Sequence, residues 1–328
     1  EIVTTRANPL VDPTLQVWGW EIPVYLFLGG WTAGIMVLSG FFMFRGHHRD
    51  RSCVCFTLPL VGFVLLSLGM GALFLDLEHK LFVFRFYTSF QLLSPMSWGA
   101  WILVVIYPVS ILQILSTLRS GYPQASPYVD RLAAGKAILD WCEANRRVIA
   151  LTAIPFGIAL GIYTGILLSA FSARPFWNSG VLGPLFLVSG LSTAAALVAL
   201  VARQHSEKVL FTRIDLVLIA AELALVALFI INLASGTEQQ LIALDSIMSG
   251  PYTFVFWVLF VGIGLLVPLL LELLEIRGLA RRVAIVAPVL VLLGGYVLRQ
   301  VMIDIGQESS WINYDTQYNA ELLQRLHE

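Results

Sequence analysis

The sequence predicts an all-α integral membrane protein with eight transmembrane helices. Its composition is 58% hydrophobic and only 12% charged, whereas soluble domains carry about 25% charged residues. The mean hydropathy is +0.82. Eight apolar segments each come close to the roughly 20 residues needed to cross a bilayer. In chain order, the segments are 22–44, 53–75, 97–118, 148–170, 181–202, 214–232, 252–274 and 284–301.

The positive charges predict which way the helices run. Fourteen of the twenty Lys and Arg residues lie in the loops after segments one, three, five and seven. Short loops rich in Lys and Arg stay in the cytoplasm, so both termini are expected on the periplasmic side of a bacterial inner membrane. The chain then divides into a periplasmic arm (1–21), an eight-helix membrane domain (22–303) and a periplasmic tail (304–328).

The first four segments carry signals for helix packing and for one surface helix. Gly157, Gly161 and Gly165 recur at a spacing of four in segment four. Small residues at this spacing let a neighbouring helix approach closely in lipid. The polar stretch between segments three and four is expected to hold a further helix from about 127 to 146, lying at the cytoplasmic surface.

Segments five to eight echo the first four. The stretch GWTAG at 30–34 resembles GLSTA at 190–194, and LGIY at 160–163 resembles LGGY at 293–296. These echoes favour two four-helix bundles, although chance similarity remains an alternative in so apolar a chain.

The residue inventory excludes several kinds of redox centre. The three cysteines (Cys53, Cys55 and Cys142) are too few for a four-iron cluster, which needs four thiolates. A transmembrane haem needs histidines inside helices, but the five histidines are expected in loops, at helix ends or in the tail. They are His47, His48, His79, His205 and His327. No basic stripe suggests nucleic-acid binding, and no metal site is expected. If the protein moves electrons, it is expected to use a diffusible membrane carrier, and elimination points to quinone.

Most candidate functional residues lie in the outer half of the membrane domain. Glu21, Asp76 and Arg174 stand at helix ends, and Tyr25 and Tyr163 lie within the outer halves of segments one and four. Polar groups are expensive to bury in lipid, so their presence there indicates a function or a specific pairing. A carboxylate at a helix end is also compatible with simple solvation.

Glu222 is the most deeply placed carboxylate. It has no Lys or Arg within a helical turn, so it is expected to stay protonated by desolvation. It is either a proton relay between the cytoplasmic side and the outer pocket, or a neutral carboxyl group hydrogen-bonded to a neighbouring helix.

Several short motifs, in order along the chain, resemble the NrfD/polysulfide-reductase membrane-subunit family. The resemblance runs from about residue 17 to residue 307. The motifs are WGWEIPVYLFLGG at 18–30, LDL at 75–77, FRF at 84–86, SPMSWGAW at 94–101, YTGILLS at 163–169, RPFW at 174–177, PLFLVSG at 184–190, GGYVLR at 294–299 and GQ at 306–307.

This resemblance implies the quinol/quinone-binding membrane subunit of a respiratory oxidoreductase complex, as in anaerobic respiration. The implied cofactor is menaquinone or ubiquinone, bound near the periplasmic surface among the first four helices. The implied partners are membrane lipid, a periplasmic 4Fe–4S ferredoxin-like subunit and a catalytic subunit, either a molybdopterin enzyme or a multihaem cytochrome. The protein would not act on the terminal substrate by itself.

Site residues carry over by position. Tyr163 corresponds to the family's tyrosine in the Tyr-Thr-Gly motif and is expected to hydrogen-bond quinone. Asp76 corresponds to the acidic end of segment two and is expected to handle protons. Where some family members have His and Asn on segment one, this chain offers Glu21 and Tyr25. Arg174 is a further candidate cofactor-binding residue, and Glu222 is a candidate for proton translocation.

Two other function classes remain open. A secondary transporter would also have eight or more helices and buried charges. A non-catalytic membrane anchor of a periplasmic enzyme would use the outer aromatic residues for docking alone. Quinone titration of the purified complex would separate the three functions.

Overall fold

The computed structural model describes residues 18–47, 52–278 and 285–309, and across these residues it is helical with no strand. The predicted all-α fold is confirmed, because eight helices in this part of the chain are long and apolar enough to span a membrane. Each overlaps a predicted segment. They are α2 (Glu21–Phe44), α3 (Cys53–Asp76), α5 (Pro95–Gly121), α8 (Arg146–Ser169), α9 (Leu182–Val201), α10 (His205–Ala234), η3 (Phe254–Leu266) continued by α12 (Val267–Ile276), and α13 (Val286–Glu308).

Two helices, α10 and α13, extend by more than one helical turn beyond the apolar segments that predicted them. α10 begins at His205, because its first turn packs against the start of α3. α13 continues to Glu308, within the predicted tail, because the polar side chains of its last turns find partners; Gln300, for example, donates to Asp304 at 2.9 Å. The arm up to residue 17 and the tail from residue 310 lie outside the described residues.

Five short helices complete the part of the fold that the structure describes. The expected surface helix is two helices, α6 (Ser126–Asp130) and α7 (Ala133–Ala144). At the opposite end of the molecule lie η2 (Lys80–Phe82), α4 (Arg85–Thr88) and α11 (Glu238–Met248), in stretches predicted as loops. A capping box between Thr237 and Gln240 starts α11, a local signal that the sequence does contain.

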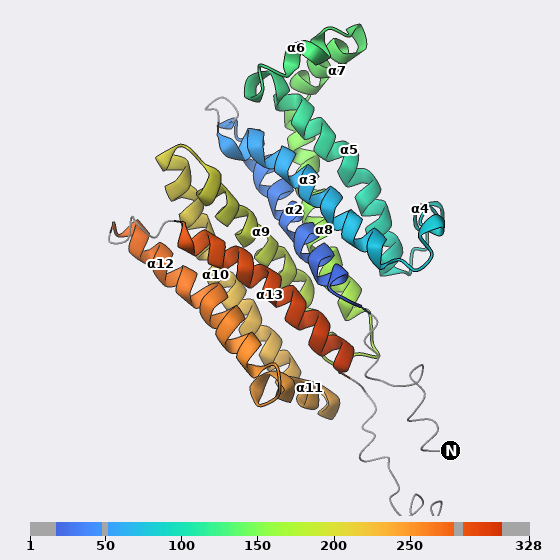
Figure 1. The fold of residues 1–328 in the computed structure, drawn as a ribbon, viewed down its shortest axis with the longest axis vertical. Coiled ribbons are helices and arrows are strands. Elements are labelled where there is room, and N and C mark those ends of the chain that lie inside the picture. The colour runs from blue at the N-terminus through green and yellow to red at the C-terminus, as the bar shows by residue number, and fades with distance from the viewer. Residues whose placement is uncertain (1–17, 48–51, 279–284, 310–328) are drawn as a thin grey trace, which may run out of the picture.

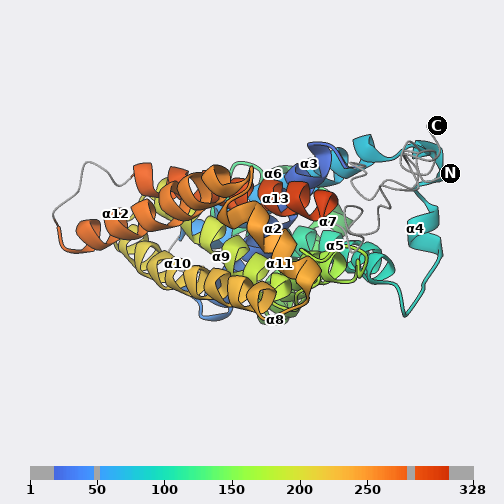
Figure 2. The ribbon, with the colours of Figure 1, turned by 90° about the horizontal axis from the view of Figure 1, so that it is seen from below.

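α2 and α9 lie at the centre of the molecule. Of the most apolar stretch of each helix, 72% is buried in α2 and 67% in α9, against 28% in α10. The blue-to-green helices and the yellow-to-red helices lie on either side of this central pair (Figures 1 and 2). Because α2 packs against α9 as well as against α3 and α8, the helix contacts alone do not separate two four-helix bundles. That division remains a prediction.

We name the two ends of the molecule by the predicted orientation. The outer end carries α4 and α11, and the inner end carries α6 and α7 (Figure 1). The helices α2, α3, α5 and α8 are called the N-terminal helices. The helices α9, α10, η3–α12 and α13 are called the C-terminal helices.

The central pair crosses at glycines. A Cβ atom added to Gly34 would lie 2.0 Å from the carbonyl oxygen of Gly190, and one added to Gly190 would lie 2.3 Å from that of Gly30. These glycines belong to the two stretches that echo each other in the sequence, so the echoing stretches pack against one another. The predicted packing face of α8 is confirmed as well, because Gly157 meets α2 whereas Gly161 and Gly165 meet α9.

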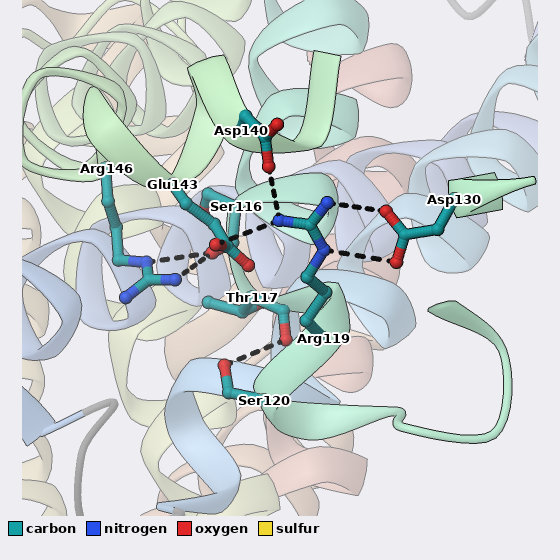
Figure 3. Close-up of polar contacts among 8 residues, drawn as sticks. All are labelled: Ser116, Thr117, Arg119, Ser120, Asp130, Asp140, Glu143 and Arg146. Atoms are coloured by element: carbon teal, nitrogen blue, oxygen red, sulfur yellow. Dashed lines mark hydrogen bonds and ion pairs between the residues drawn. The ribbon is translucent and has the colours of Figure 1, made fainter. Parts of the chain in front are cut away.

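Arg119 holds the surface helices against the inner end of α5. Its Nη1 atom donates to Asp140 at 2.7 Å and to Glu143 at 3.3 Å, and its Nε atom donates to Asp130 at 3.2 Å (Figure 3). These hydrogen bonds hold the pKa of the Asp130 carboxyl below its ordinary value. The contact is therefore present at neutral pH and is lost only when the pH falls below that lowered pKa.

Glu207, in the first turn of α10, caps the start of α3. Its carboxylate accepts hydrogen bonds from the Ser52 hydroxyl, the Cys53 amide at 3.2 Å and the Val54 amide at 3.1 Å. A carboxylate at a helix N-terminus satisfies free amides and complements the helix dipole. Glu207 is thus a buried carboxylate with donors around it.

The glycine crossing gives a testable prediction. Gly34→Ala places a methyl group where the Gly190 carbonyl lies, and overpacking of this kind costs about 1–3 kcal/mol. We expect the thermal unfolding midpoint of the detergent-purified protein to fall by several degrees. Gly29→Ala is the matched control, because a Cβ there meets nothing within 4 Å. Equal midpoints for the two variants would contradict the crossing.

Candidate functional site

A cavity of about 600 Å³ opens among the N-terminal helices at the outer end. Four of the side chains that line it carry oxygen groups: Tyr25 on α2, Asp76 on α3, Tyr87 on α4 and Tyr163 on α8. Nearly all of the remaining wall is apolar. Its apolar side chains include Ile22, Leu26, Met70, Leu73, Phe74, Val83, Phe86, Met96, Leu103, Leu167 and Leu168.

Tyr163 occupies a space that only glycine leaves free. A Cβ atom on Gly99 of α5 would lie 1.9 Å from Cζ of the Tyr163 ring and 2.1 Å from its hydroxyl oxygen. The ring therefore lies directly against the α5 backbone. Its hydroxyl group is the hydrogen-bonding partner of the Tyr25 hydroxyl. Two buried phenols from α2 and α8 thus meet in one wall of the cavity.

Two carboxylates, Asp76 and Glu21, belong to helix ends at the cavity. Asp76 is the last residue of α3 and lines the cavity directly. Glu21, the first residue of α2, is not among the lining residues, but its charge acts on Asp76. The structure therefore brings together four of the residues singled out from sequence, namely Glu21, Tyr25, Asp76 and Tyr163.

Tyr87 was not singled out from the sequence, although it lines the cavity. It lies on α4 in the segment 77–94, where Val83 and Phe86 also face the cavity. Burial, with a smaller effect of Tyr107, raises the pKa of the Tyr87 phenol above its ordinary value. Tyr87 therefore stays protonated at neutral pH and can donate a hydrogen bond. The aromatic content of this segment was the only sequence signal for it.

Arg174 does not line the cavity. Its Nη1 atom donates to the backbone carbonyls of Gln307 at 2.6 Å and Ser309 at 2.9 Å, at the C-terminal end of α13. The side chain of Gln307 in turn pairs with the backbone of Trp18. It accepts from the Trp18 amide at 2.7 Å and donates to the Trp18 carbonyl at 3.1 Å. These hydrogen bonds connect Arg174 to the cavity through α13 and Trp18.

Trp18, which lines the cavity, is fixed from a second direction by an aromatic stack. Its ring stacks on Trp177 with centroids 5.4 Å apart, and Phe171 meets it edge-on at 5.6 Å. The indole nitrogen of Trp177 donates to the Met302 carbonyl at 2.6 Å. The motif residues Gly306 and Gln307 thus position the entry to α2 rather than line the cavity.

Glu222 lies away from the cavity, among the C-terminal helices. It is buried, and its neighbours are Ser189 on α9 and Arg299 on α13. Arg299 is also buried, and it donates to the Ser189 hydroxyl at 2.5 Å and the Phe186 carbonyl at 3.1 Å. The sequence places no Lys or Arg within a helical turn of Glu222, and the structure brings the Arg299 guanidinium near it from another helix.

The cavity suits a flat apolar molecule with polar oxygens. Its walls are mostly apolar, and three phenols and a carboxylate among the lining residues can bond carbonyl or hydroxyl groups. Across the described ranges, no cluster of three or more His, Cys, Asp or Glu residues could hold a metal ion. The arrangement can donate hydrogen bonds from phenols and exchange protons at Asp76.

Comparison with known proteins shows which sequences this chain is similar to. The family described as "Polysulphide reductase, NrfD" matches residues 7–309. Protein NrfD of Escherichia coli is 30% identical over 78% of this chain and 84% of its own length. A polysulfide reductase chain of Wolinella succinogenes is 26% identical over 89% of the present sequence and 94% of its own. A selenate reductase subunit of Mesobacillus selenatarsenatis is 23% identical over 77% and 66% respectively.

The contact between Gly99 and Tyr163 gives a second prediction. Gly99→Ala must push the Tyr163 ring away from α5, because no Cβ atom tolerates a contact of 1.9 Å. We expect a structure of the variant to show this ring displaced and its contact with the Tyr25 hydroxyl broken. Gly71→Ala is the matched control, since Gly71 also lines the cavity and a Cβ there meets nothing within 4 Å. An unmoved ring would contradict the assigned packing.

Proposed function

The chain belongs to the NrfD family of polysulphide reductase membrane proteins, and on this premise we propose that it is the quinone-reactive membrane subunit of a respiratory oxidoreductase complex. The cavity at the outer end carries the proposal, because it combines apolar walls with Tyr25, Asp76 and Tyr163. Relatives named as parts of polysulfide and selenate reductases support a role in a multisubunit reductase.

The residues present fit a quinone head group. The Tyr163 and Tyr25 phenols would hydrogen-bond one oxygen of the ring, and Tyr87 and Asp76 would hydrogen-bond the other. Trp18 and Phe86 would contact the ring edges, and the apolar side chains of α3 and α5 would contact the isoprenoid tail. Menaquinone and ubiquinone both have these parts.

Proton transfer is the task of the carboxylates. When bound, the quinone couple supplies two electrons and two protons on oxidation of the quinol, or takes up the same number on reduction. Asp76 would accept or deliver protons at the ring oxygen, because a general base must lie within hydrogen-bond reach. Glu21, whose charge acts on Asp76, would pass protons between Asp76 and the outer water. The tyrosines hold the ring oxygens and keep their own protons.

The electrons leave or enter through a partner at the outer end. The proposed partner is a 4Fe–4S ferredoxin-like subunit, which connects to a molybdopterin or multihaem catalytic subunit. In the segment 77–94, which lies beside the cavity, the exposed fraction is 88% for Leu81 and 93% for Leu93. The proposed setting is the bacterial inner membrane with the outer end facing the periplasm, as the distribution of Lys and Arg supports.

The two other function classes make different demands. A transporter would place its substrate near the midplane between repeats, whereas this cavity lies at one end and within the N-terminal helices. A simple anchor would not need three phenols and a carboxylate around an apolar cavity. Quinol titration of the purified complex distinguishes all three classes.

A second role, proton transfer through the C-terminal helices, is favoured by Glu222. A carboxylate buried in the membrane domain is expensive unless it is paired or used. Glu222 has one oxygen without a hydrogen-bond partner, even though Arg299 and Ser189 lie beside it. We propose that this carboxyl group takes part in moving protons.

Tyr163→Phe tests the quinone site. The substitution removes one hydroxyl group and leaves the ring packed against Gly99. A hydrogen bond to a neutral partner contributes about 0.5–1.5 kcal/mol, so quinol-linked turnover of the assembled complex should fall roughly 2–10-fold. Tyr128→Phe is the control, because Tyr128 is an exposed phenol on α6, at the opposite end of the molecule from the cavity. Unchanged turnover in Tyr163→Phe would remove this phenol from the site.

Glu222→Gln tests the second role in proteoliposomes that contain the assembled complex. The variant keeps the shape and loses the titrating group, so we expect quinone turnover within about twofold of wild type and fewer protons translocated per electron. Measurement of both rates in the same vesicles supplies the internal control. Equal proton-to-electron ratios would leave Glu222 with a packing role only.

A further inference from the structure

Asp215 and Glu272 form a second buried polar cluster, which the quinone site does not use. Asp215 lies on α10 and is fully buried, and Glu272 lies on α12 with an exposed fraction of 1%. The Ser192 hydroxyl on α9 donates to one Asp215 oxygen at 2.5 Å. The other Asp215 oxygen and both Glu272 oxygens have no hydrogen-bond partner.

The two carboxyl groups interact with each other directly. Neither offers a donor while both are ionised, which explains why three of their four oxygens are unpartnered. Two ionised carboxylates in contact away from water would combine a desolvation cost with like-charge repulsion. One proton between them removes both costs, because a carboxylic acid donates to the neighbouring carboxylate.

The surrounding charges do not replace that proton. The charged groups that act on the pair are themselves carboxylates: Glu222, on α10, acts on Asp215, and Glu275, on α12, acts on Glu272. From α9, the facing group is the neutral Ser192. On α13, the guanidinium of Arg299 acts on Glu222. The pair therefore differs from Glu207, whose carboxylate is held by three donors.

We propose that Asp215 and Glu272 are a binding site for one exchangeable proton, loaded from the inner end. Glu275 lies one turn beyond Glu272, is only partly buried, and interacts with Lys208 and His205 near the start of α10. It offers the path to inner water. In the other direction, Glu222 lies seven residues after Asp215 on α10, about 10 Å along the helix axis. On α9, Ser189 lies one turn before Ser192 in the sequence.

This site extends the role proposed for Glu222 by one step towards the inner end. It depends on that role only for the direction in which the proton moves. Occupancy by a proton is a property of the C-terminal helices alone, and it can be measured without quinone. Failure of the Tyr163 prediction would therefore leave it intact.

Labelling with dicyclohexylcarbodiimide tests the site, because this apolar reagent modifies protonated carboxyl groups within a membrane. The assembled complex is treated at pH 7, and the modification of each acidic residue is quantified by peptide mass spectrometry. We expect label on Asp215 or Glu272, totalling no more than one per chain. Glu207 is the internal control and should stay unlabelled. Absence of label from both members of the pair at pH 7 would overturn the proposal.

Two variants and an ion control sharpen the result. In Asp215→Asn and Glu272→Gln, the new amide donates to the remaining carboxylate, which no longer needs the proton. Labelling of the remaining acid should fall at least tenfold in each variant, and undiminished labelling would contradict a shared proton. Wild-type labelling should be the same in 100 mM NaCl and 100 mM KCl. Protection by sodium alone would assign the site to Na⁺ and overturn the proton assignment.

Discussion

The close crossing of α2 and α9 is the contact on which the rest of this structure depends. Gly34 and Gly190 let the two backbones touch, and small residues at such a crossing are what lipid-embedded helices need to pack tightly. α2 also carries the cavity residues Ile22 and Tyr25, while α9 carries Ser189 and Ser192, which meet the buried charges. The nearest guanidinium atom of Arg299 would lie 3.1 Å from a Cβ on Gly30. One helix pair thus fixes the cavity and the buried charges relative to each other.

The buried ionisable groups fall into two kinds, separated by their hydrogen bonds. Glu207 accepts three hydrogen bonds at the start of α3. A carboxylate in this position satisfies free helix amides and serves packing. Asp215, Glu222 and Glu272 retain oxygens without a partner. A bilayer offers no water to complete them, so these are the groups for which we propose proton exchange.

The two halves of the protein divide the proposed chemistry. The cavity and its phenols lie among the N-terminal helices. The buried carboxylates Asp215, Glu222 and Glu272 lie among the C-terminal helices. α13 contributes to both, since Arg299 lies beside Glu222 and Gln307 binds the backbone of Trp18 at the cavity. A shift of α13 along its axis would therefore act on both groups of residues.

The sequence by itself determined the class of fold and the place of each membrane helix in the chain, because apolar length is a local property that matches the thickness of the bilayer. It also singled out Tyr25, Asp76 and Tyr163, since polar residues stand out within apolar helices, and the packing role of Gly157, Gly161 and Gly165. Only the tertiary structure decided which polar groups meet. Tyr87, from the segment 77–94, lines the cavity. Arg174 donates hydrogen bonds to the end of α13, and Arg299 lies beside Glu222 although the two are on different helices. These pairings join residues up to 135 positions apart, and no local pattern encodes the helix crossings that bring them together.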